Sequence, residues 1–186
     1  MTLKDVLIMS ANLLNLPECE TLESINEENY TEVLESNKSI KKLFNLAITS
    51  LREICLNYLP IVVEVDVRAV DKKIETNTLE DFVKLVKVKL NDKPVSYKFK
   101  NGTINVKNDE VYTVQYVQNP KVSKITDSLE IFEELSPDIL VLGICSYYAI
   151  SMGMYDEFEY YHEEYLKRAE SIKKLGIYQM PSRRWL

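Results

Sequence analysis

His162 is the one histidine of the chain, and it lies three residues after Glu159. On a helix this spacing puts both side chains on one face, and a Glu-x-x-His pair is half of the ligand set of a di-iron carboxylate site. Such a site needs a second Glu-x-x-His from another helix, which a single histidine cannot supply. We therefore predict that His162 is a surface or interface residue and that the chain binds no metal and no cofactor.

The other side chains that could do chemistry are three cysteines, Cys19, Cys55 and Cys145, which are far apart and form no Cys-x-x-Cys motif. Cys55 and Cys145 lie on apolar stretches, so we expect small buried hydrophobes in a reducing compartment. The sequence has no glycine-rich phosphate loop and no G-x-S-x-G elbow, and nothing pairs two carboxylates in a recognisable cleft. These observations favour a protein that is not an enzyme. The alternative is a small cytoplasmic enzyme that uses surface carboxylates.

Acidic and basic residues are separated along the C-terminal third, although the net charge is only −6. Between residues 125 and 166 there is no Lys or Arg, and from residue 167 onward six bases accompany one acid, Glu170. A solvated helical face is the usual origin of such a charge run. Complete separation also suits head-to-tail contacts between copies, or a channel wall that must not bind DNA phosphates. The acids of this stretch are Asp127, Glu130, Glu133, Glu134, Asp138, Asp156, Glu157, Glu159, Glu163 and Glu164.

The elements that must position these residues indicate an α+β fold in a single domain of 186 residues. Residues 1–60 read as helices: Thr2 and Asp5 resemble a capping box, and Asn37 can cap a long amphipathic helix that Pro60 ends. A short helix is expected around residues 28–34. From residue 61 the apolar period changes from 3.6 to 2, which predicts a small antiparallel β-meander over residues 61–118 with a hairpin turn at Asn101-Gly102.

The helical period returns in residues 128–175. Ser136-Pro137-Asp138 is a helix start, residues 138–152 are apolar nearly all round, and Gly153 separates them from a second helix over residues 155–175. These two helices form an antiparallel hairpin, of which the first should be buried. Residues 177–186 follow as an extended tail. The longest apolar run, residues 139–150, is too short to span a bilayer, and no secretory signal is visible, so we expect a soluble cytoplasmic chain.

The tail ends in Arg183-Arg184-Trp185-Leu186, which combines a large apolar ring with two rigid cations. Trp and Arg are the residue types that anchor protein interfaces. The tail could bind to one of three surfaces: the sheet of the same chain, a neighbouring subunit, or nucleic acid. We favour a neighbouring subunit, since two basic residues give little affinity for nucleic-acid phosphates. Tyr155 and Tyr160 are further candidates for an interface.

Three segments together resemble the head–tail adaptor (connector) proteins of long-tailed phages and prophages of Gram-positive hosts. The hairpin segment 144–157 carries small, apolar and aromatic residues, then Gly, then an aromatic–acid–acid turn. The segment 181–186 is similar to the terminal Arg-Arg-Trp of that family, and the helix ending Leu59-Pro60 precedes the sheet. The similarity covers about residues 37–186, and the acidic stretch 17–37 matches nothing in it.

The resemblance implies a structural protein of the virion neck, assembled in the host cytoplasm. Copies would form a homo-oligomeric ring, commonly of twelve, beneath the portal protein, extend the DNA channel and dock a downstream neck or tail protein. DNA would pass without sequence-specific binding, and no membrane would be involved. The tail would contact the portal or the adjacent subunit through Tyr178, Arg183, Arg184, Trp185 and Leu186, and lumen-facing acids would include Asp156, Glu157, Glu159 and Glu163. Another neck or tail-completion component, such as a stopper or terminator, is the nearest alternative.

Overall fold

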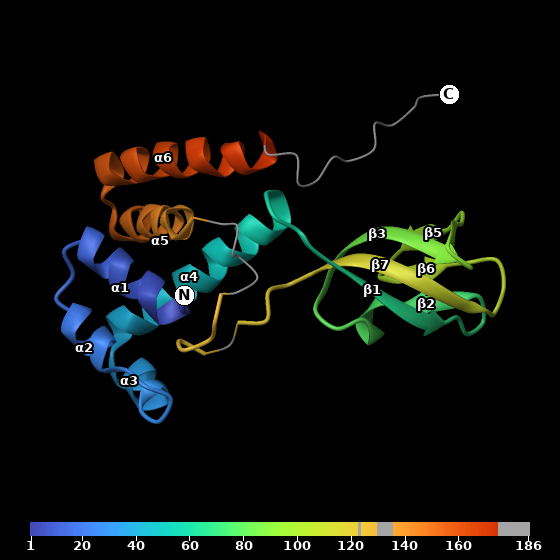
Figure 1. The fold of residues 1–186 in the computed structure, drawn as a ribbon, viewed down its shortest axis with the longest axis horizontal. Coiled ribbons are helices and arrows are strands. Elements are labelled where there is room, and N and C mark those ends of the chain that lie inside the picture. The colour runs from blue at the N-terminus through green and yellow to red at the C-terminus, as the bar shows by residue number, and fades with distance from the viewer. Residues whose placement is uncertain (123, 130–135, 175–186) are drawn as a thin grey trace. The chain divides into compact units, whose positions relative to one another are not determined.

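The chain has an α+β fold, and its computed structural model describes residues 1–122, 124–129 and 136–174 (Figure 1). It divides into two compact units. The helical unit comprises Met1–Leu59 and Lys121–Leu186, and the β unit comprises Pro60–Pro120. The β unit is therefore an insertion between the two parts of the helical unit. That all 186 residues act as a single adaptor domain stays a prediction.

The helical unit contains six helices in its described part, and capping residues explain where two of them, α1 and α4, begin. Thr2 and Asp5 form the expected capping box, with the Asp5 carboxylate accepting from the Thr2 backbone N–H at 2.8 Å. Asn37 accepts from the backbone N–H groups of Ser39 and Ile40 and so caps the long amphipathic helix α4. The helices are α1 (Leu3–Leu13), α2 (Cys19–Ser24), α3 (Tyr30–Ser36), α4 (Lys38–Asn57), α5 (Pro137–Met152) and α6 (Tyr155–Lys174).

Helix α5 is the centre of the helical unit, as its apolar sequence predicts. It contacts α1, α4 and α6, and its buried residues occur on all sides of the helix axis. Gly153 ends it in the left-handed conformation (φ 74°), which favours glycine and allows the immediate turn into α6. Gly143 permits a close approach to α4, because a Cβ at this position would collide with the Ser50 hydroxyl. None of the helices in the described ranges is long and apolar enough to cross a membrane.

The β unit contains two antiparallel sheets that bury one shared core. The larger has the strand order β1-β7-β3-β4 and the smaller the order β2-β6-β5. Ile74 and Ile104 of the smaller sheet pack with Val88, Val114 and Tyr116 of the larger one. The strands are β1 (Ile61–Arg68), β2 (Lys73–Glu75), β3 (Phe82–Leu90), β4 (Lys93–Pro94), β5 (Lys98–Lys100), β6 (Thr103–Asn105) and β7 (Val111–Gln118), with a 3-10 turn η1 (Thr76–Thr78).

The strand order corrects the expected β-meander. The sheets are antiparallel and span residues 61–118 as predicted, but β1 pairs along its length with β7, the last strand, rather than with its neighbour in the chain. The hairpin at Asn101-Gly102 is confirmed, since both residues have positive φ, as a two-residue turn of this kind requires. Helix α2 was not expected, because only a short helix around residues 28–34 was predicted between the two capped helices, and that one is observed as α3.

Candidate functional site

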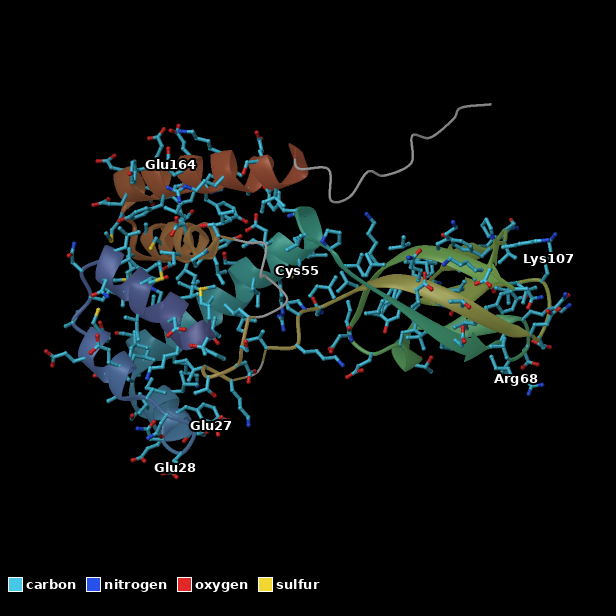
Figure 2. All side chains as sticks on the ribbon, in the orientation of Figure 1. Glu27, Glu28, Cys55, Arg68, Lys107 and Glu164 are labelled. Atoms are coloured by element: carbon cyan, nitrogen blue, oxygen red, sulfur yellow. The ribbon has the colours of Figure 1, made fainter. Side chains whose placement is uncertain are left out.

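The acidic residues proposed for a channel wall are all on α6, and all four are exposed. At about 100° per residue, Asp156, Glu159 and Glu163 lie within about 60° of one another around the helix axis, on the side opposite the buried residues. Glu157 lies on a different flank. Among the described residues none of the four has an ion-pair or hydrogen-bond partner. Carboxylate oxygens project from the side of α6 away from α5 in Figure 2.

His162 lies on α6 and packs toward α5, and its contacts explain its position by packing alone. Its ring stacks on Phe158 at 5.1 Å between centroids and is tilted against Tyr165 at 6.3 Å. The Nδ1 atom lies 3.3 Å from the Ser146 hydroxyl. A histidine beside a serine hydroxyl is the arrangement that activates a catalytic serine. A catalytic serine must contact its substrate, however, and Ser146 is only 3% exposed in the middle of α5, so the pair does not form such a site. In the described ranges no group of three or more possible ligands could hold a metal ion.

A second polar cluster joins α4, α5 and α6 around the Glu53 carboxylate. The Tyr147 hydroxyl donates to Glu53 at 2.6 Å, and burial together with this hydrogen bond raises the pKa of Tyr147 to about 12. Burial and the charge of Glu53 also raise the pKa of Tyr165, whose ring meets Tyr58 edge-on at 6.2 Å. The neutral Tyr147 thus holds the Glu53 carboxylate between α4 and α5 and helps to fix their packing.

The buried thiols behave as the sequence predicts. Cys55 and Cys145 are about 1% and 0% exposed, and burial raises the pKa of each to about 12. A thiol with such a pKa is protonated at neutral pH and is a poor nucleophile. Cys55 lies on α4 inside the helical unit (Figure 2). Cys19 is more accessible, and its Sγ lies 3.2 Å from the side-chain oxygen of Asn12.

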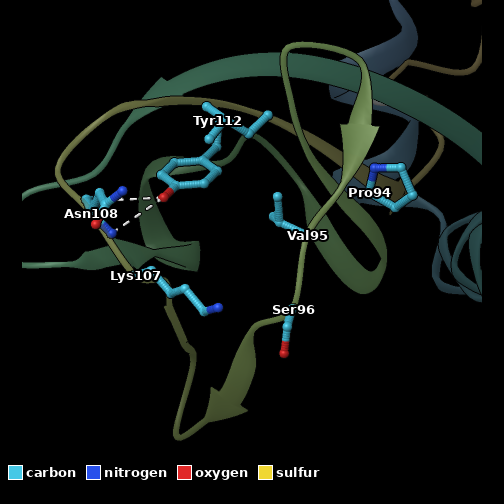
Figure 3. A pocket seen from close by; sticks show the side chains of 7 residues that line it. Pro94, Val95, Ser96, Lys107, Asn108 and Tyr112 are labelled. Carbon is cyan, nitrogen blue, oxygen red and sulfur yellow. Dashed lines mark hydrogen bonds between the residues drawn. The ribbon is translucent and has the colours of Figure 1, made fainter.

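The β unit contains a shallow pocket of about 300 Å³ beside Tyr112 (Figure 3). The Tyr112 hydroxyl donates to the Asn108 carbonyl oxygen at 3.2 Å and so is already satisfied within the loop. Lys107 supplies the one charged side chain of the lining. This arrangement stabilises the loop before β7. The lining residues are Leu90, Pro94, Val95, Ser96, Lys107, Asn108 and Tyr112.

The helical unit carries a larger groove, of about 630 Å³, between α1, α5 and α6. Its walls include exposed apolar side chains, notably that of Leu13, which is 44% exposed. The signal that could have found it is the pair of apolar residues Met9 and Leu13, one turn apart on α1. The lining residues are Met9, Asn12, Leu13, Asp138, Val141, Leu142, Tyr160, Tyr161 and Arg168.

The interface residues proposed in the tail, Tyr178, Arg183, Arg184, Trp185 and Leu186, lie outside the residues that the structure describes. Tyr155 and Tyr160 lie within them and are 70% and 64% exposed, so they are free to contact another molecule. The chain matches no known family model and no curated protein. Its resemblance to head–tail adaptors stays a hypothesis that depends on the residues named for it.

Proposed function

We propose that this protein is a structural head–tail adaptor of a phage neck. Copies form a ring, of twelve subunits in our proposal, beneath the portal protein, extend the DNA channel and dock the next neck or tail protein. The subunit is assembled in the host cytoplasm and resides in the virion neck. The proposal draws on the resemblance of segments 144–157 and 181–186 to that family.

The observation that carries the proposal is the outer face of α6. Three carboxylates, Asp156, Glu159 and Glu163, share one exposed side of a rigid helix, and the chain has no basic residue between positions 125 and 166 to neutralise them. DNA phosphates are repelled by such a surface, so DNA passes along it without being bound. A ring of copies with this face directed inward would form a channel whose wall does not bind DNA.

The α5–α6 hairpin suits the body of such a ring. Helix α5 is buried on all sides, Gly153 fixes the turn, and α6 is held by its apolar face, so its outer face is presented by a rigid scaffold. Sites on packed helices hold their geometry better than sites on loops. The exposed Tyr155 and Tyr160 supply amphipathic surface of the type that protein contacts favour.

The test is reconstitution with the portal protein encoded by the same phage or prophage genome, followed by electron microscopy. We expect the full chain to add a ring to the portal. Deleting Ser182–Leu186 should leave a folded protein, by circular dichroism, that no longer attaches. Normal attachment of the truncated chain would disprove the role of the tail, and failure of the full chain to bind portal would disprove the adaptor function.

A further inference from the structure

The groove of the helical unit is bounded by exposed apolar side chains rather than closed over by them. Met9 and Leu13 of α1 are 39% and 44% exposed, and Tyr160 of α6 is 64% exposed. Val141 and Leu142 of α5, almost completely buried, form the floor. Apolar surface gains free energy when it leaves water, and concave apolar sites of roughly 300–1,000 Å³ are typical ligand-binding sites. The groove therefore has the size and chemistry to receive an aromatic side chain.

Charged groups lie at one end of the groove and beside it on α6. At one end Arg168 donates to Asp138 at 2.9 Å and lies 4.0 Å from Glu164, so its charge is already shared. Glu157 does not line the groove, but it lies one turn before Tyr160 and Tyr161, on the same flank of α6. Since Glu157 has no ion-pair partner among the described residues, a cation beside the groove would be stabilised there.

The last twelve residues of the chain, 175–186, contain the complementary groups. They include the chain's single tryptophan, Trp185, directly after two arginines and directly before Leu186. An aromatic ring with a leucine fits the apolar groove, and a guanidinium pairs with a carboxylate in a planar, two-bond geometry. A segment of this length spans at most roughly 40 Å when extended, which is enough to reach an adjacent subunit.

We propose that this groove receives residues 183–186 of a second copy of the chain, with Trp185 against Leu13 and Tyr160 and an arginine beside Glu157. A second copy is the occupant that ring formation requires; the chain's own tail could reach residues 160–168 only by running back along α6, and the concentration dependence described below distinguishes the two. Passing the tail to the next copy makes a head-to-tail contact, the type that closes rings. The inference rests on the proposed function, which requires contacts between copies.

Trp185, as the only tryptophan, reports its own surroundings by fluorescence in the full-length protein. We expect its emission to move to shorter wavelength as protein concentration rises, in parallel with the mass measured by analytical ultracentrifugation. Leu13→Lys removes a wall of the groove and adds a charge that repels arginine. It should weaken self-association about tenfold or more and keep the emission at the solvent-exposed wavelength.

Leu56→Lys is the matched control. Leu56 on α4 has nearly the same exposed fraction as Leu13, 46% against 44%, but does not line the groove. It should behave as the unaltered protein does. Glu157→Gln should weaken association and reduce its salt dependence, whereas Glu163→Gln, on the outer face of α6, should do neither. Circular dichroism checks that each variant is folded.

Three outcomes would overturn this inference. A short-wavelength emission that does not depend on concentration would mean that each chain binds its own tail. An emission that stays solvent-exposed at every concentration would mean that the groove does not receive Trp185, and equal effects of Leu13→Lys and Leu56→Lys would mean that another surface does. None of these results decides whether the chain attaches to portal, so the adaptor proposal is tested separately by the reconstitution above.

Discussion

The two units of this protein treat their buried hydroxyl groups differently. In the β unit, Tyr112 and Tyr116 are 2% and 1% exposed, and each donates to a backbone carbonyl, of Asn108 and Glu80 respectively. In the helical unit, the hydroxyls of Ser50 and Tyr165 are buried without a hydrogen-bond partner in the described part of the chain. A helix carbonyl already accepts a backbone N–H and is reached mainly by a hydroxyl of its own helix, as the buried Ser10 donates to the Val6 carbonyl at 2.8 Å. Loops between strands leave carbonyl groups free for hydroxyls from other elements. Hydroxyls at helix–helix contacts, such as those of Ser50 and Tyr165, can therefore lack the partner that a loop carbonyl supplies in the β unit.

The sharpest test of this comparison is whether the two cores are separate. Ile144 on α5 and Ile104 on β6 are both 0% exposed. Replacing either with alanine should cost about 2–5 kcal/mol, because a buried cavity is added to the lost transfer free energy. Native-state hydrogen exchange should show that Ile144→Ala lowers amide protection in the helical unit and Ile104→Ala in the β unit. Loss of protection in both units from either variant would show that the cores unfold together.

The next test concerns the close contact between α4 and α5. Gly143→Ala should destabilise the helical unit by roughly 1–3 kcal/mol, because the new methyl group collides with the Ser50 hydroxyl. Ser50→Ala alone should be close to neutral, since it removes a buried group that has no partner in the described chain. Combined, the two changes should restore most of the loss, as measured by urea unfolding in a double-mutant cycle. Simple additivity would contradict the assigned contact.

The smallest expected effect compares two equally buried tyrosines. Tyr116→Phe removes a 3.0 Å hydrogen bond to the Glu80 carbonyl and should cost about 1 kcal/mol. Tyr165→Phe removes a hydroxyl without such a partner and should leave the free energy of unfolding unchanged or slightly higher. Both are measured by chemical unfolding, followed by hydrogen exchange in each unit. A larger loss for Tyr165→Phe would mean that its hydroxyl is paired in solution, for instance through water.

Much of the helical unit could be predicted from sequence, because its signals are local. The Thr2 and Asn37 caps, the apolar stripe of α4 and the glycine after α5 each determine structure within a few residues. The pairing of β1 with β7 is different in kind. Alternation shows that Val63, Val65 and Val67 share a face, but only the tertiary fold sets them opposite Tyr116, Val114 and Tyr112. Short elements such as α2 and β2 are equally hard to predict, since their stability comes from neighbours.

The candidate site shows the same limit. From the sequence we expected four acids of one helix to face the lumen together. Helical geometry places three of them on the outer face of α6 and Glu157 on the side of the groove. The groove itself depends on how α1 meets the α5–α6 hairpin, which no spacing within one helix reveals. Leu13 illustrates the difference, since its position in the apolar pattern of α1 suggests the core although it is half exposed.

The insertion of the β unit has a consequence for synthesis on the ribosome. Helices α1–α4 emerge first, but the helix that fills their core, α5, emerges only after the whole of Pro60–Pro120. The β unit has all its strand partners within one continuous segment, so it can fold while translation continues. Until then, the apolar stripe of α4 lacks its packing partner α5 in the nascent chain. We therefore expect the middle of this protein to reach its native structure before its beginning does.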